Sequence, residues 1–136
     1  MIGAAFLCLV VAVHDGDGPI RCANGVKVRV AGIQAPDYDN AQPCRTRRPG
    51  YVCSDRLADR SRAIVTRMVL KRTLTCQPVG RSYSRVVARC RFADGRDLSC
   101  AILAAGAATK WDSYWRRYRM VACPRPRRSR AGRTDV

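Results

Sequence analysis

Three short segments of the chain carry charged side chains whose types and spacing could do chemistry. Asp15 and Asp17 share a glycine-rich turn. Arg29 lies in an alternating run with Asp37 just beyond it, and Arg85 begins a third segment. Carboxylate oxygens suit calcium or magnesium, paired arginines can hold a phosphate group, and a free carboxylate can take a proton from water. Together these residues predict a site that cleaves phosphodiester bonds.

Strands joined by tight turns are expected to position the first two segments. Residues 6–13 are a β-rich apolar run, and residues 20–23 can return as a second strand after the turn. Asn24-Gly25 is a strong hairpin signal. Apolar and polar residues then alternate over residues 26–31, which is typical of a half-buried strand.

The second half of the chain predicts a loop, two helices and a hairpin. Residues 34–53 hold three prolines and show no periodicity, which indicates a long loop. Ser54 or Asp55 can cap a helix over residues 56–71, whose apolar residues share one face.

Beyond that helix, residues 73–77 and 85–92 predict a second hairpin. Asp97 can cap a short helix over residues 98–105, with Gly106 at its end. Three strands, a helix, two strands and a helix suit a β-rich α+β fold, a small five-stranded barrel with two helices.

The composition favours a polyanionic partner. The 136 residues include 26 Lys and Arg against 10 Asp and Glu, a net charge of +16, and 47% of them are hydrophobic. This apolar content is enough for a folded domain, and the charge favours nucleic acid, an anionic membrane or an acidic polysaccharide. Every acidic residue is Asp, so any carboxylate chemistry has to use Asp.

Eight cysteines predict four disulfides and an oxidising compartment. Two pairs flank turns symmetrically, which would place their members opposite each other on hairpins. A third pair would close the long loop, and the fourth is what remains. The expected pairings are Cys8–Cys22, Cys76–Cys90, Cys44–Cys53 and Cys100–Cys123. Eight free thiols in a cytosolic protein are the alternative, whereas a zinc site would lack a close ligand pair.

The apolar run at residues 2–13 is too short to span a bilayer, and no Lys or Arg precedes it as in an export signal. It is better interpreted as a buried first strand. We expect an exported protein, periplasmic or secreted, with its signal upstream of Met1 and without a transmembrane segment.

Four motifs follow one another in a specific order. They are HDGD at residues 14–17, VKVRVAGIQAPD at 26–37, YSRVVA at 83–88 and ADGRDLSCAILAAGAA at 93–108. In this order they resemble the thermonuclease (staphylococcal nuclease-like) family, over roughly residues 6–115. The resemblance implies an OB-type five-stranded barrel with helices, and calcium-dependent hydrolysis of phosphodiester bonds in DNA and RNA.

The resemblance also implies a role for each matched residue. Arg29 and Arg85 would bind the phosphate group, and Arg85 would also stabilise the leaving group. Asp37 would be the general base, where the family carries Glu. Asp17 would bind the metal ion, and Tyr83 would lie beside the nucleotide.

The metal site departs from the family pattern. Gln34 and Ala35 stand where the family commonly has Asp and Thr, so they would offer an amide oxygen and a backbone carbonyl as ligands. One negative charge is lost, and calcium affinity depends on ligand charge, so we expect weaker binding. Asp37 is one methylene shorter than Glu, which predicts slower chemistry or a moving loop. Asp15 and His14 are interpreted as turn or surface residues.

Aromatic and basic residues interleave near the C-terminus. Lys110, Trp111 and Tyr114 are expected to bind nucleic acid by stacking on bases, and packing of the tail against the barrel is the alternative. Residues 1–115 are expected to form the nuclease-like domain. Residues 116–136, with eight Arg, are expected to form a flexible cationic tail.

We therefore expect a monomeric, exported hydrolase of nucleic-acid phosphodiester bonds, whose partner is DNA or RNA. Its expected cofactor is calcium, with another divalent cation, or none, as the alternatives. A catalytically degenerate basic module that binds nucleic acid would keep the same fold, and is the main alternative function. A polycation that binds membranes or polysaccharides through its tail is the third.

Overall fold

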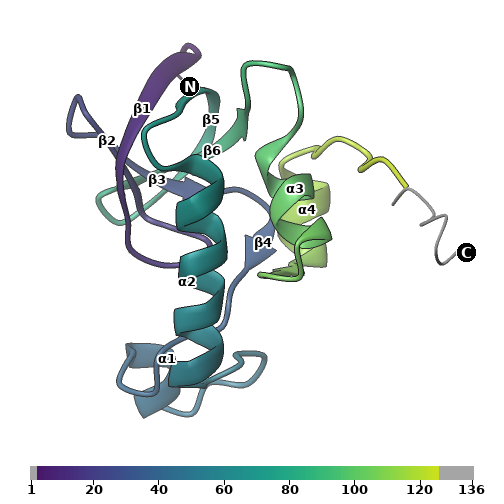
Figure 1. Cartoon of the computed structure of the whole chain (residues 1–136). Coiled ribbons are helices and arrows are strands. Elements are labelled where there is room, and N and C mark those ends of the chain that lie inside the picture. Colours follow the sequence, from purple (N-terminus) through teal and green to yellow (C-terminus); the bar gives the residue numbers. More distant parts are fainter. Residues whose placement is uncertain (1–2, 126–136) are drawn as a thin grey trace, which may run out of the picture.

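A closed five-stranded barrel forms the body of the protein (Figure 1), and confirms the predicted barrel of OB type. The computed structural model describes residues 3–125. Around the barrel the strands follow the order β1 (Phe6–Val13), β2 (Ile20–Cys22), β3 (Lys27–Val30), β6 (Arg85–Arg91) and β5 (Thr73–Ser82). Strand β3 runs parallel to β6, and the other neighbouring strands are antiparallel.

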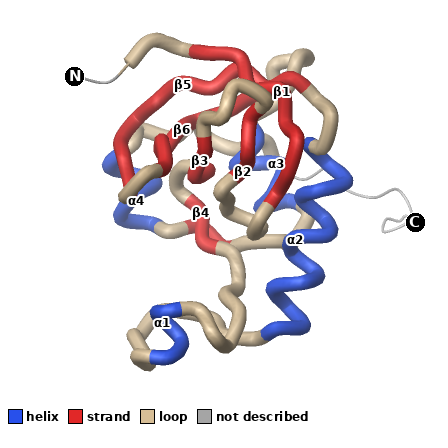
Figure 2. Tube along the Cα trace, turned by 90° about the vertical axis from the view of Figure 1, so that its left-hand side faces the viewer, coloured by secondary structure: helices blue, strands red, loops and turns tan. Residues whose placement is uncertain are grey.

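Four helices lie outside the barrel in the described part of the chain (Figure 2). The expected ones are α2 (Asp55–Val69) and α3 (Leu98–Ala104), and the Ser54 and Asp97 side chains cap them as predicted. The sequence did not predict α1 (Gln42–Arg45) and α4 (Asp112–Arg117). Both are too short for a helical apolar period to show, and neither buries a residue.

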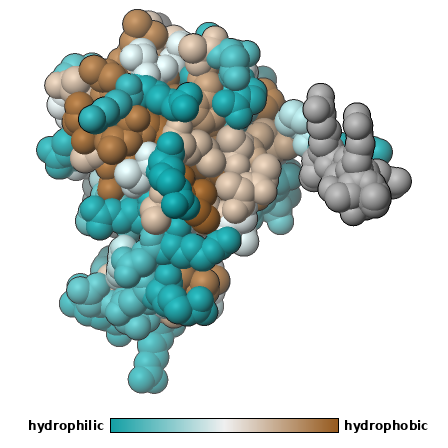
Figure 3. Space-filling model, viewed as in Figure 1, coloured by the Kyte–Doolittle hydropathy of each residue, from teal (hydrophilic) through white to brown (hydrophobic). Residues whose placement is uncertain are grey.

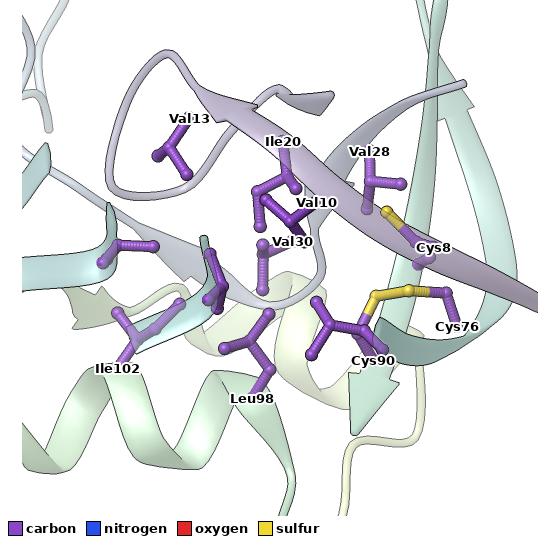
Figure 4. Packing of buried hydrophobic residues seen from close by; sticks show 14 of the residues in the cluster. Cys8, Val10, Val13, Ile20, Val28, Val30, Cys76, Cys90, Leu98 and Ile102 are labelled. Carbon is purple, nitrogen blue, oxygen red and sulfur yellow. A yellow bond between two sulfur atoms is a disulfide. The ribbon is translucent and has the colours of Figure 1, made fainter. Parts of the chain in front are cut away.

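The core lies inside the barrel and beneath α3 (Figure 4). Val10 of β1 and Val28 and Val30 of β3 point inward, and Leu98 and Ile102 of α3 pack against them, each 0–1% exposed. Because successive side chains on a strand point to opposite faces, the residues between these valines face outward. The outer faces of β2 and β3 are therefore free to carry charged residues.

Helix α2 fixes the turn that carries the two carboxylates. Buried Ser61 of α2 donates from its hydroxyl to the Ala107 carbonyl, 2.6 Å away. Gly16 lies directly against Ser61, where any Cβ would overlap the hydroxyl. Gly18 has a φ of +112°, and a Cβ there would press on the backbone carbonyl of Val28. Two glycines therefore allow the turn to fit between α2 and β3.

The four expected disulfides are present, and no described cysteine is free. Cys76 and Cys90 lie directly opposite each other on β5 and β6, as the symmetry argument predicts. Cys8–Cys22 forms in a different register, because the hairpin is centred beyond residue 15, with Val13 opposite Ile20 and Val10 opposite Cys22. Four disulfides are typical of proteins in oxidising environments.

The segment between β4 (Ile33–Gln34) and α2 forms a lobe that extends away from the barrel (Figure 1). We call residues 38–52 the α1 lobe. The Cys44–Cys53 disulfide closes it, so the predicted long loop is tied down and also contains a helical turn. The face of the lobe seen in Figure 3 is mostly hydrophilic.

The segment after α3 returns to the barrel. Strand β7 (Thr109–Lys110) pairs with β4, and Cys123 is joined to Cys100 of α3. The boundary expected after residue 115 falls inside α4, and residues 126–136 of the expected tail lie outside the described residues. Within the described part, no helix has the length and apolarity needed to cross a bilayer.

Candidate active site

A cavity of about 370 Å³ brings most of the predicted site residues together. Its lining comes from the β1–β2 turn, β3, the segment after β4, the α1 lobe, the β5–β6 hairpin and α4. The predicted residues among the lining are Asp17, Arg29, Gln34, Asp37, Arg85, Trp111 and Tyr114. Segments far apart in the sequence therefore meet at one site, which we call the main cavity.

Asp17 links three elements at one side of the main cavity. Its Oδ2 accepts a hydrogen bond of 2.8 Å from the backbone N–H of Ala35, and lies 3.5 Å from Nη2 of Arg29. Its backbone carbonyl accepts a hydrogen bond from the N–H of Val30. Both charged side chains are only 15% exposed, so this ion pair is shielded from solvent. Asp17 therefore orients Arg29 as well as lining the cavity.

Asp37 lies on the loop that leads into the α1 lobe. Its backbone N–H donates to the Val52 carbonyl, and its carbonyl accepts from the N–H of Ser54. Burial, together with the charges of Asp17 and Asp15, raises the pKa of the Asp37 carboxyl to about 6 against the opposing effect of Arg29. Because of this shift, Asp37 can gain and lose a proton near neutral pH.

Asp15 also lines the main cavity, although the sequence indicated only a turn residue. Burial raises the pKa of its carboxyl, and the neighbouring charge of Asp17 adds to the rise. Its Oδ1 is buried and has no hydrogen-bond partner among the described residues. An unpartnered buried oxygen is costly, so Asp15 is a polar group that a bound cation or water could satisfy.

Arg85 is the first residue of β6 and lines the main cavity. Its Nε and Nη2 donate to the carbonyl and hydroxyl of Ser82, at 3.3 and 2.9 Å, across the hairpin turn. Nη1 makes no hydrogen bond to a described residue. The hairpin thus fixes the guanidinium and leaves one nitrogen for a ligand.

Three predicted site residues lie outside the lining of the main cavity. Tyr83 is at the tip of the β5–β6 turn with 91% of its surface exposed. Lys110 places its ammonium 4.6 Å from the ring centroid of Trp115. Ala35 takes part through its backbone N–H, which is bound to Asp17. Tyr83 is thus exposed beside the site instead of inside it.

An aromatic wall forms one side of the main cavity, and only part of it was foreseen. We use this name for Tyr51, Trp111, Tyr114 and Tyr118. Successive ring centroids are 6.1, 4.8 and 5.6 Å apart in that order. Arg48 lies 5.6 Å from the Tyr51 ring centroid, so a cation borders the wall. This spacing suits stacking on bases as well as packing between the rings.

The sequence did not predict a role for Arg48 and Tyr51, which the α1 lobe brings to the main cavity. Their only signal was their place between Cys44 and Cys53, in a loop that a disulfide would hold. Arg81, which also lines the cavity, lies two residues before the YSRVVA motif.

The main cavity has more cations than anions. Four arginines and three aspartates line it, and among residues 3–125 Arg29–Asp17 is its single ion pair. The remaining guanidiniums therefore face the cavity without a carboxylate within ion-pair distance, which favours an anionic ligand.

The oxygen donors of the main cavity are of the type that divalent cations prefer, but they are few. Asp15, Asp17 and Gln34 offer hard oxygen ligands, and the unpartnered oxygen of Asp15 is available. Over residues 3–125, however, no three His, Cys, Asp or Glu side chains converge on a common point. The residues present therefore fit a cation that the protein holds through few ligands.

No protein-family model matches the chain, and no curated protein matches it either.

Proposed function

We propose that this protein is a nuclease-like hydrolase that cleaves phosphodiester bonds of DNA or RNA in the main cavity. The observation that carries the proposal is the meeting of Asp37, whose pKa is raised to about 6, with Arg29 and Arg85 in one cavity. A carboxylate with this pKa is ionised at neutral pH and is still basic enough to take a proton from water.

In the proposed reaction, Asp37 accepts a proton from a water molecule as the water oxygen bonds to phosphorus. The ester bond on the opposite side of phosphorus breaks, and the leaving oxygen takes up a proton from solvent. Asp37 then returns its proton to solvent. General-base assistance of this kind contributes about 10²–10⁴-fold to a rate.

Arg29 and Arg85 would stabilise the charge on the phosphoryl oxygens. Arg29 is held by Asp17 and by the carbonyl of Val30, 2.7 Å from its Nη1. Arg85 is held by Ser82. Because both guanidiniums are already oriented before a phosphate binds, little reorganisation is needed in the transition state.

A divalent cation such as calcium would be held by Asp17, the amide oxygen of Gln34 and the carbonyl of Ala35, with Asp15 as a further ligand. When bound, it would supply positive charge against a phosphoryl oxygen. The loss of one carboxylate at Gln34 predicts weak binding, and hence activity that needs a high calcium concentration.

We also propose that the enzyme is exported and acts as a monomer on DNA or RNA. Four disulfides support an oxidising environment, and the aromatic wall with its neighbouring arginines supports binding of unpaired bases.

The test is cleavage of labelled single-stranded DNA with calcium, and then with a chelator. Arg85→Ala should lower kcat/KM by about 10²-fold or more, since one stabilising donor for the transition state is lost. Arg91→Ala, an exposed arginine farther along the same strand, is the matched control and should cleave like the wild type. Tight, salt-sensitive binding by the wild type without cleavage at any metal concentration would refute the enzyme.

That outcome would favour the second candidate, a basic module that binds nucleic acid without cleaving it. The observation in its favour is the engagement of Asp17, whose Oδ2 is already bonded to Ala35 and Arg29. A carboxylate used in this way stabilises the fold and has less capacity left for a metal ion.

A further inference from the structure

A second cavity, of about 480 Å³, adjoins the main cavity. The two share Asp15 and Arg85, which therefore stand between them. The cations of this accessory cavity are Arg21, Lys27, Arg62 and Arg85, with His14 beside them, and Asp15 is the one carboxylate in its lining.

The barrel register explains why these cations meet. Arg21 of β2 pairs directly with Lys27 of β3. Val28 of β3 pairs with Val86 of β6, so the preceding residues, Lys27 and Arg85, fall in line. A row of three cations thus crosses three neighbouring strands and ends at the main cavity.

Like charges directly opposite each other on a sheet are destabilising. Among residues 3–125, neither Arg21 nor Lys27 has a carboxylate within ion-pair distance. Arg62 of α2 adds to the concentration of charge, and its Nε donates to the Val13 carbonyl at 3.1 Å, which fixes its position. The row therefore has positive charge that a bound anion would neutralise.

We propose that the accessory cavity binds a phosphate group of the same nucleic-acid strand, next to the phosphate in the main cavity. This inference rests on the proposed function. The strand would pass over Arg85, with its bases against the aromatic wall on one side and its backbone against Arg21, Lys27 and Arg62 on the other. A site that contacts the strand on both sides of the cleaved bond would bind within the strand and not at its end.

The test compares two double variants that lose the same charge. Arg21→Gln/Lys27→Gln removes two cations of the accessory cavity, and Arg72→Gln/Arg91→Gln removes two exposed arginines that line neither cavity. Binding of a fluorescent 15-nucleotide oligothymidylate, in chelator to prevent cleavage, is measured against salt concentration. Melting temperatures check that both variants fold.

Loss of two contacts with phosphates lowers the slope of log affinity against log salt by about 1.4 for a single strand. We expect the slope to fall by this amount in Arg21→Gln/Lys27→Gln and by much less in the control. An equal fall in slope in the two double variants, or an unchanged slope in Arg21→Gln/Lys27→Gln, would overturn the inference. A loss of heparin binding with no change for the oligonucleotide would also overturn it, in favour of an acidic polysaccharide.

The outcomes separate this inference from the proposed function. Cleavage by the wild type with an unchanged slope in Arg21→Gln/Lys27→Gln refutes only the accessory site. Binding without cleavage, together with the expected fall in slope, refutes only the enzyme. A wild-type protein that does not bind the oligonucleotide refutes both.

Discussion

At the scale of single residues, the raised pKa of Asp37 suits a general base but lowers the stability of the fold at neutral pH. Its pKa is raised to about 6 by burial and by the charges of Asp17 and Asp15. A carboxyl whose pKa is higher in the folded than in the unfolded protein stabilises the fold when protonated. This contribution is complete below the ordinary pKa of 3.8 and is lost as the pH rises through about 6.

Asp37→Asn should therefore make the protein less active and more stable at pH 8. We expect kcat/KM to fall about 10²–10⁴-fold, because the general base is lost. The free energy of unfolding at pH 8 should rise by about 1 kcal/mol relative to wild type, a value discounted because the side chain is partly exposed. This gain should disappear between pH 6 and pH 4, as thermal unfolding across that range would reveal.

In the wild type, kcat/KM should rise with pH through about 6, as Asp37 ionises. Asp39→Asn, an exposed carboxylate nearby in the same loop, is the control and should change neither activity nor stability appreciably. An Asp37→Asn protein that keeps wild-type activity would show that another group accepts the proton.

Sequence motifs located the central charged residues but not everything around them. Asp17, Arg29 and Arg85 were found because each lies at a recognisable position on a turn or strand. Asp15 was interpreted as a turn residue, since its burial depends on the packing of Gly16 against α2. The environment of a side chain in a turn depends on distant elements, which local spacing does not encode.

At the scale of elements, the end of the α1 lobe and the residue before α2 position Asp37 through backbone hydrogen bonds to Val52 and Ser54. These two residues flank Cys53, whose disulfide to Cys44 closes the lobe. Helix α1 buries no residue, so few apolar contacts hold the lobe in place. The disulfide therefore constrains the loop that carries the proposed base, together with hydrogen bonds from Tyr38 and Asp39 to α2.

Replacing both cysteines, Cys44→Ser/Cys53→Ser, should affect activity more than global stability. We expect kcat to fall about 10-fold or more, because a displaced base lies outside the reach of one hydrogen bond. Removing Cys8–Cys22, whose cysteines lie in the core, should instead cost about 2–5 kcal/mol of stability. Activity assays and thermal unfolding of the two double variants measure both effects. Full activity in Cys44→Ser/Cys53→Ser would show that the lobe holds Asp37 without its disulfide.

Elements with a strong period were predictable, and short ones were not. The barrel strands, α2 and α3 follow from alternation, capping residues and glycine signals. Helices α1 and α4 span four and six residues, so each completes too few turns for a period to appear. Helix α4 carries or flanks three residues of the aromatic wall, and the fourth, Tyr51, follows α1 in a segment where the sequence predicted only a loop.

At the scale of the whole molecule, the net charge of +16 divides into groups with different expected roles. Arg29 and Arg85 face the main cavity, and Arg21, Lys27 and Arg62 extend the positive surface into the accessory cavity. The last 13 residues, after Cys123, add five further arginines. The barrel places the cavity cations beside the proposed site, so they are the ones expected to select how a strand lies.

Truncation after Cys123 should separate these roles, because it removes the five terminal arginines and retains the Cys100–Cys123 disulfide. Each lost phosphate contact lowers the salt slope for a single strand by about 0.7, so we expect a fall of up to about 3.5. Turnover at saturating substrate should not change, since no residue of the main cavity is removed. A truncated protein with the full salt slope would show that the terminal arginines do not contact the strand. Undiminished binding of the truncated protein to anionic vesicles would likewise rule out a membrane role for them.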